Sequence, residues 1–511
     1  MEKPLQRDIV ELPRLLLIRE QEMAQKVETA AARVSGRIPP ILRLPAELLT
    51  WIAELATADQ PRDSWRYRSA IRNDKWVTDG NDFECDSWNT FRLCLVSRRF
   101  YAIACPILYR HLVIEMNAAK NGHLGMWGRR SFFTYSGEAI SDLRRTLETT
   151  PSLHRYCRTL HIGLYSSNDP DEVVGVSNLV QALSNTRKLR LFVSRQLLSL
   201  EQIAPIMASV RRHMNNLEAL QSLGDNHLDG WEVAQLMLAL PQLRSLQLSI
   251  DAGRGTEEIA EQNWKTVKVG PSSRNGFPAT TSTNESGFTL HQERVMALTS
   301  LHIHGCQSDP STIRRLLLLP KNLEHFSFRL GWNDENVAAT LPLLFSHLSP
   351  HRKALRSIEI GCLFNDRPTG LDGFSLAGFE SLETLELPKN STGSQDGYEK
   401  IAAAPRLKTF SWNFQSDDSF MGLCLDHFRQ AEEDWIRGLA AAAARRKSPL
   451  ENIHVIFEPD NWGVPPEVWP WDRMDNIAKD FRDAGITVTY TEPNVTKSQI
   501  VPYYYHNPVP D

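Results

Sequence analysis

Long apolar runs are missing from this 511-residue sequence, and their absence excludes several classes of protein. No stretch approaches the roughly 18 to 20 apolar residues that a membrane-spanning helix requires. The first twenty residues contain only the short run from Leu15 to Ile18 and no small-residue cleavage site, which argues against a secretory signal. We therefore expect a soluble protein with no membrane partner, located in the cytoplasm, the nucleus or both.

Cysteine and net positive charge are also scarce. The seven cysteines include no CxxC pair, which argues against a disulfide scaffold and against a zinc module. The chain has 57 Lys and Arg residues against 61 Asp and Glu residues, so its formal charge is -4 and no overall basic field attracts nucleic acid. We expect reduced, mostly buried thiols and no nucleic-acid partner.

Signatures of catalysis and of cofactor binding are absent as well. The sequence has no GxGxxG, no Walker loop, no HExxH and no GxSxG turn. His302 and His304 lie on one face of an expected strand with Cys306 nearby, and these residue types bind metals. Outward strand positions are polar in any case, so we interpret the three as structural. The sequence predicts no enzyme activity, no metal site and no cofactor.

The N-terminal part contains a small helical unit with more apolar surface than it can bury. Residues 1–40 form a charged helical arm that ends in SGRIPP, and LPAELLTWIAELA from Leu44 has apolar residues at helical spacing. A polar insert at 60–88 follows, and then LCLVSRRFYAIACPILYR, in which Ser97 suits a helix N-cap and Pro106 should end the helix. Because three short helices cannot hide these side chains, a partner site is expected. The alternative is an ordinary helical hairpin covered by a larger core.

These two segments resemble an F-box of the filamentous-fungal type, over residues 41–115 apart from the insert. The quoted signatures are the LPxELLxxI helix, then LCLVSRRFY, then PILYRHLVI. The resemblance implies docking of an apolar helical surface onto the Skp-type adaptor of cullin-RING ubiquitin ligases, and through it onto cullin. The contact residues it implies are Pro45, Leu48, Ile52, Leu95, Val96 and Phe100.

The remainder, residues 116–491, has the pattern expected of an array of degenerate leucine-rich repeats. LxxLxL-like segments recur mostly 25 to 32 residues apart, beginning at Cys157, Leu189, Leu217, Leu243, Leu298, Leu323, Leu355, Leu382, Leu407 and Leu450. Each predicts a short strand, the stretches between them read as helices, and AGITVTY at 484–490 predicts a last strand. The predicted fold class is α/β: a three-helix F-box followed by a solenoid with strands on its concave side.

Three segments stay open to more than one interpretation. The Gly- and Ser-rich stretch 253–292 predicts a flexible loop. The tryptophans of the 60–88 insert either anchor a partner or fold back over the helical unit. The tail 492–511, with Tyr503 to Tyr505 between prolines, lies along the concave face or frays.

Together these features predict the substrate-recognition subunit of an SCF-type E3 ubiquitin ligase. The F-box binds the adaptor, the repeats bind a target protein, and the chain supplies no reacting group. By strand parity, the side chains that should be exposed on the concave side for the target are Gln247, His302, Ser327, Glu359, Glu386 and Ser411. The alternative is an F-box and repeat scaffold that acts outside any ligase.

Overall fold

The structure is a computed structural model and describes part of the 511-residue chain. The described residues are 44–57, 93–116, 134–135, 137–164, 170–193, 200–224, 240–249, 296–306, 310–330, 341–361, 371, 375–392, 396–414, 423–459, 462–463, 466–493, 495–499 and 501–502. The N-terminal arm, the whole 60–88 insert, the 253–292 loop and Tyr503 to Tyr505 therefore lie outside them.

The chain divides into two compact units, which are described separately. Unit 1 comprises Met1–Asn226 and Ala239–Leu243, and unit 2 comprises His227–Leu238 and Arg244–Asp511. The division lies inside the predicted repeats rather than near residue 115, so unit 1 holds both the segment that resembles an F-box and the first repeats.

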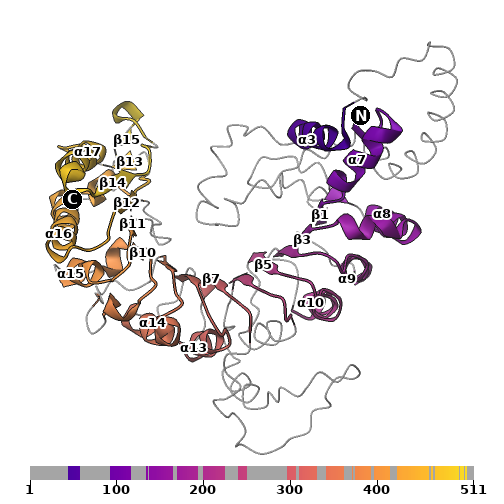
Figure 1. Cartoon of the computed structure of the whole chain (residues 1–511), viewed down its shortest axis with the longest axis horizontal. Coiled ribbons are helices and arrows are strands. Elements are labelled where there is room, and N and C mark those ends of the chain that lie inside the picture. Colours follow the sequence, from indigo (N-terminus) through magenta and orange to yellow (C-terminus); the bar gives the residue numbers. More distant parts are fainter. Residues whose placement is uncertain are drawn as a thin grey trace, which may run out of the picture. The chain divides into compact units, whose positions relative to one another are not determined.

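Unit 1 is a parallel sheet preceded by two helices, and an α-helix lies in each of the three connections from the second to the fifth strand (Figure 1). Its strands are ordered β2-β1-β3-β4-β5. Its elements are α3 (Ala46–Thr57), α7 (Arg98–Leu108), β1 (His111–Met116), β2 (Thr134–Tyr135), α8 (Gly137–Thr149), η3 (Pro151–Tyr156), β3 (Thr159–Leu164), α9 (Pro170–Ala182), β4 (Lys188–Val193), α10 (Leu200–His213) and β5 (Ala219–Gly224).

Unit 2 continues the same strand–helix alternation, with strands in the order β6-β7-β8-β9-β10-β11-β12-β14 and a separate parallel pair, β13 and β15. Its strands are β6 (Ser245–Ser249), β7 (Ser300–Cys306), β8 (His325–Leu330), β9 (Ser357–Ile360), β10 (Thr384–Pro388), β11 (Thr409–Asn413), β12 (Asn452–Ile456), β13 (Trp462–Gly463), β14 (Thr487–Tyr490) and β15 (Val501–Pro502). Its helices are α13 (Pro310–Leu318), α14 (Leu341–Leu348), η5 (Ser349–His351), η6 (Leu376–Gly378), η7 (Lys389–Ser391), α15 (Asp396–Ala402), η8 (Leu425–His427), α16 (Gln430–Arg446), α17 (Pro470–Phe481), η9 (Arg482–Ala484) and η10 (Lys497–Gln499). Figure 1 shows α13 to α17 on one side of this sheet.

The core consists of the leucines that the repeat pattern singles out. In β6 and β7 the side chains of Leu246, Leu248, Leu301 and Ile303 are fully buried, and they alternate with polar side chains on the other face. Burial of each such side chain is worth about 1.5–3 kcal/mol, and a single strand–helix unit has no surface to bury it against. The repeats therefore stabilise one another through their neighbours.

The structure confirms an α/β fold with short parallel strands at the LxxLxL segments and at 484–490. Pro106 does not end its helix, contrary to expectation, because α7 continues to Leu108. The bonds that close the helix, from Tyr109 N to Cys105 O and from Arg110 N to Ile107 O, do not need the N–H that proline lacks. The sheet also starts earlier than the repeat pattern indicated, since β1 begins at His111, inside the segment 41–115, and pairs with β3.

None of the helices in the described part of the chain has both the length and the apolar character that a membrane span requires.

Candidate functional site

The helices α3 and α7 pack together and expose an apolar surface. On α3, Leu49 and Ala53 are fully buried, whereas Leu48 and Trp51 on the opposite side are 45% and 64% exposed. Residues at i and i+3 lie on one face of a helix, so the amphipathic spacing of the sequence produces both faces. The guanidinium of Arg99 donates to the carbonyl oxygen of Leu44 at 2.7 Å and joins α7 to the start of α3.

The turn before α7 completes this surface. Val96 N donates to Leu93 O at 3.1 Å, and the Oγ of Ser97 accepts a hydrogen bond from Phe100 N at 3.1 Å as the helix N-cap. The cap fixes the chain direction so that Val96 is turned outward and 58% exposed. Val96 lies where the turn enters the helix.

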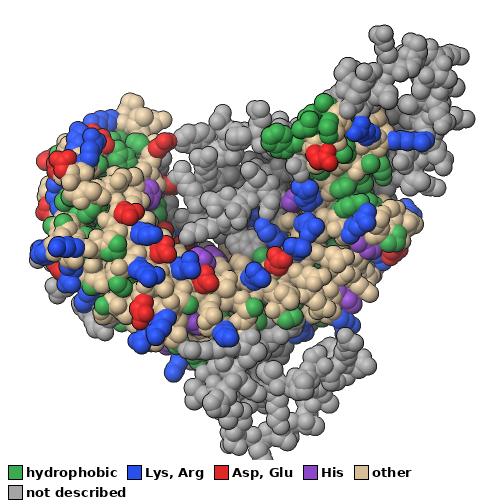
Figure 2. Space-filling view, in the orientation of Figure 1, with side chains coloured by type: hydrophobic (Ala, Val, Ile, Leu, Met, Phe, Trp, Pro, Cys, Tyr) green, Lys and Arg blue, Asp and Glu red, His purple; other side chains and the backbone are tan. Residues whose placement is uncertain are grey.

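We call Leu48, Trp51 and Val96 the apolar surface. They are three of the five large hydrophobic side chains that are exposed in the described part of the chain, and Figure 2 shows hydrophobic side chains gathered over α3 and α7. Such a concentration on a small element is typical of an interaction site. Trp51 was not among the contact residues expected from the sequence, although its helical spacing from Leu48 could have identified it.

The other expected adaptor residues divide into surface and core. Pro45 is exposed, and Ile52 and Leu95 are half-buried beside the apolar surface. Phe100 is only 3% exposed, so the expectation that it offers a contact surface is not supported. Its backbone N–H donates to the Oγ of Ser97, and its ring is part of the core.

The six expected target-binding residues form one row across the sheet of unit 2, as strand parity predicted. Register places Gln247 beside His302, then Ser327, Glu359, Glu386 and Ser411 in successive strands. The expectation that they are exposed is wrong for Gln247, His302, Ser327, Glu359 and Ser411, which are all 9% exposed or less, and Glu386 is half-buried.

Hydrogen bonds along the sheet explain part of this burial. Glu359 accepts from the Arg329 guanidinium at 3.0 Å, and Glu386 accepts from Asn413 Nδ2 at 2.8 Å. His302 Nε2 lies 2.8 Å from Ser300 Oγ. Because parallel strands are about 4.8 Å apart, neighbouring side chains of the row cover one another, and Glu359 and Glu386 bond side chains of the adjacent strands. Their role in target binding stays a prediction.

Burial holds three titratable groups of unit 1 in their neutral forms. Burial raises the pKa of Cys94 to about 12 and that of Cys157 to about 11, so both thiols stay protonated at neutral pH and are weak nucleophiles. On β3, burial and then the charge of Arg190 lower the pKa of His161 to about 3. These groups are therefore parts of the core.

One group of metal-ligand types comes together in the described residues, formed by Cys424, Asp426 and His427 around η8 with ligand atoms within 4.8 Å of one another. Helix capping accounts for it. Cys424 N donates to His427 Nδ1 at 3.2 Å, the Cys424 side chain accepts from the His427 backbone, and Asp426 is paired with Arg429. The local chain direction brings these side chains together without a metal.

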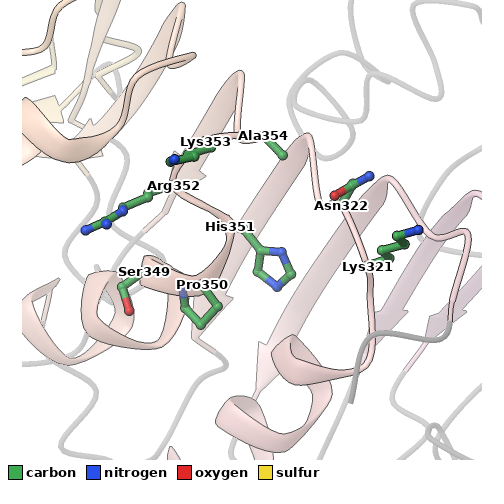
Figure 3. A pocket seen from close by; sticks show the side chains of 8 residues that line it. All are labelled: Lys321, Asn322, Ser349, Pro350, His351, Arg352, Lys353 and Ala354. Atoms are coloured by element: carbon green, nitrogen blue, oxygen red, sulfur yellow. The ribbon is translucent and has the colours of Figure 1, made fainter. Parts of the chain in front are cut away.

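A pocket of about 610 Å³ in unit 2 is lined by basic side chains that do not converge (Figure 3). His351 forms its wall, with Nε2 2.6 Å from Leu317 O and Nδ1 accepting from Leu323 N at 3.4 Å. Figure 3 shows Lys321 and Arg352 directed to opposite sides. The pocket therefore has a hydrogen-bonded wall but no common point where an anion would meet these charges.

Comparisons with known proteins give limited information. No family model matches the chain, and no curated protein matches it. Among solved structures, it resembles one described as the crystal structure of the Rad7 and Elc1 complex in yeast, with 12% identity, a TM-score of 0.36 and 96% of each chain covered. A likeness at this level does not identify a function.

Proposed function

We propose that the chain is a substrate-recognition subunit of an SCF-type ubiquitin ligase, and that the apolar surface docks onto a Skp-type adaptor. The exposure of Leu48, Trp51 and Val96 carries the proposal, because these large apolar side chains are not packed against the described residues. The resemblance of LPAELLTWIAELA and LCLVSRRFYAIACPILYR to an F-box supplies the identity of the partner.

The energetics fit a docking surface of this size. Burying Leu48 and Val96 against a partner contributes about 2 kcal/mol each, and a central Trp is a common hot spot of protein interfaces. Two aspartates at positions 48 and 96 remove those contacts and place charges in an apolar interface. A loss of about 4 kcal/mol corresponds to roughly a thousandfold weaker binding.

The test is affinity purification of the full chain beside Leu48→Asp/Val96→Asp, with mass spectrometry of the bound proteins. Adaptor and cullin should be lost from the double variant. The matched control is Val174→Asp on α9, because Val174 is a 52% exposed valine in the same unit but outside the apolar surface. It should retain both partners, and a wild-type chain that captures no adaptor would refute the docking proposal.

Whether cullin is captured together with the adaptor distinguishes the ligase proposal from the scaffold alternative. If adaptor is captured without cullin, and no partner's lifetime changes when the chain is removed, the chain acts as an adaptor-bound scaffold. The ligase proposal expects cullin in the complex and at least one partner that becomes longer-lived when Leu48→Asp/Val96→Asp replaces the wild type.

A further inference from the structure

The pocket of unit 2 is formed by two loops from neighbouring repeats. Lys321 and Asn322 precede β8, Ser349 to Ala354 precede β9, and together these residues line a space of about 610 Å³ (Figure 3). We call these eight residues the basic pocket. Pockets that hold ligands in proteins have volumes of about 300–1,000 Å³, so a bound molecule has room to enter this one.

Hydrogen bonds to the backbone hold the two loops together. The His351 ring is 2% exposed and accepts from Leu323 N at Nδ1, so the proton of the ring is on Nε2, which donates to Leu317 O at 2.6 Å. A further bond runs from Ala354 N to His351 O at 2.8 Å. Because Leu323 directly follows Asn322, the ring fixes one loop against the other. The loops are therefore held in place without a ligand, which lowers the entropy cost of binding one.

The basic pocket has three cationic side chains and no carboxylate among its lining residues. Lys321, Arg352 and Lys353 are exposed, and none of them forms an ion pair within the described part of the chain. Glu380, at the equivalent position of the next repeat, is exposed and does not line the pocket. Single exposed cations without partners are ordinary on a protein surface, but here two loops bring three of them around one pocket. Since the whole chain has a charge of -4, this positive charge is a local feature.

The arrangement of these cations favours an extended ligand. Lys321 and Lys353 each lie four residues before a paired strand position, so they occupy equivalent places in neighbouring repeats. Their surroundings do not focus the charge on one point, because Figure 3 shows Lys321 and Arg352 directed to opposite sides. A single phosphate or carboxylate therefore meets only part of the positive charge, whereas an extended chain with several carboxylates can meet all of it.

We infer that the basic pocket binds an extended acidic segment of a partner protein. Alternate side chains of an extended chain lie roughly 7 Å apart on one face, so separate carboxylates can pair with separate cations of the pocket. Asn322 offers its amide to the peptide backbone, and Pro350 offers apolar contact. A nucleic acid fits less well, because the residues that line the pocket include no Phe, Tyr or Trp for base stacking. The inference does not depend on adaptor docking, since the apolar surface belongs to unit 1.

The experiment measures binding of a fluorescent Asp/Glu-rich peptide about eight residues long to the full chain, by anisotropy at low salt. The same peptide with Asn and Gln in place of Asp and Glu is the ligand control. Arg352→Gln/Lys353→Gln should weaken binding of the acidic peptide at least about tenfold, because charge-assisted hydrogen bonds are lost. The matched control is Lys479→Gln/Arg482→Gln, which removes two exposed cations of unit 2 that do not line the pocket. It should bind the peptide as the wild type does.

Thermal unfolding provides the folding control, because exposed side chains contribute little to stability and both double variants should keep the wild-type midpoint. If Arg352→Gln/Lys353→Gln lowers the midpoint, Lys321→Gln from the other loop takes its place and should also weaken binding. The inference is overturned if the wild-type chain does not bind the acidic peptide or binds the neutral peptide equally well. It is also overturned if the pocket variants bind as tightly as the control variant, or if a single-stranded oligonucleotide binds more tightly than the peptide.

Discussion

At the scale of single residues, Gly361 shows how one small side chain permits a buried ion pair. Its position directly follows β9, and a Cβ atom added there would overlap Arg329 Cγ. Arg329 must pass over this glycine to pair with Glu359, whose side chain is 9% exposed. The sequence contains both residues but does not show that they lie in contact, because they belong to neighbouring repeats and are 32 positions apart.

Gly361→Ala should therefore displace Arg329 and leave the Glu359 carboxylate buried without its partner. We expect a loss of about 1–3 kcal/mol in the free energy of unfolding, measured by urea denaturation. The same substitution made in an Arg329→Ala background should cost almost nothing, because the clash has been removed. Equal costs in both backgrounds would show that Gly361 acts through its backbone instead.

The buried His161 should make the stability of unit 1 depend on pH. Its pKa is about 3 in the folded chain and 6.5 without burial, so between these values the unfolded state binds a proton that the folded state does not. Stability should therefore fall as the pH drops from about 6.5 toward 3, by up to roughly 1.4 kcal/mol per pH unit from this group. His161→Gln should reduce that slope in urea unfolding measured at pH 7 and pH 5, and an unchanged slope would contradict the assignment.

At the scale of elements, the positions of the strands could be predicted from the sequence, whereas the burial of their polar side chains could not. The alternation of apolar and polar residues within an LxxLxL segment predicts a strand locally, which gives β3 to β12. The alternation in 484–490 gives β14 in the same way. Burial of His302 or Ser411 depends on which side chains neighbouring strands place beside them, and those neighbours are 25 to 55 residues away in the sequence. The basic pocket could not be predicted for the same reason, since Lys321 and Lys353 are 32 positions apart in the sequence.

The helices α16 and α17 are joined by a buried carboxylate. Glu433 accepts from Arg437 of its own helix at 2.9 Å and from Arg473 of α17 at 2.9 Å, and it is 9% exposed. Glu433→Ala leaves two partly buried guanidinium groups without this acceptor and should cost about 2 kcal/mol or more. The matched control is Asp434→Ala, since Asp434 is the exposed neighbour on the same helix. Thermal unfolding of both variants tests whether the packing of α17 depends on Glu433.

At the scale of the whole molecule, the two proposed binding surfaces differ in physical character, and salt should distinguish them. The apolar surface of Leu48, Trp51 and Val96 binds by removing hydrocarbon from water, which moderate salt hardly changes. The basic pocket binds by charge, and screening at higher ionic strength weakens interactions between exposed charges. Raising the salt concentration several-fold should therefore release the acidic peptide while the adaptor stays bound.

The two double variants should each lose one ligand and keep the other, because the two surfaces have no residue in common. Leu48→Asp/Val96→Asp should lose the adaptor and keep the affinity of the wild type for the acidic peptide, and Arg352→Gln/Lys353→Gln should do the reverse. Both measurements use the full chain, anisotropy for the peptide and co-purification for the adaptor. If either double variant loses both ligands, the surfaces are coupled or the variant is misfolded, and its midpoint of thermal unfolding decides between these two explanations.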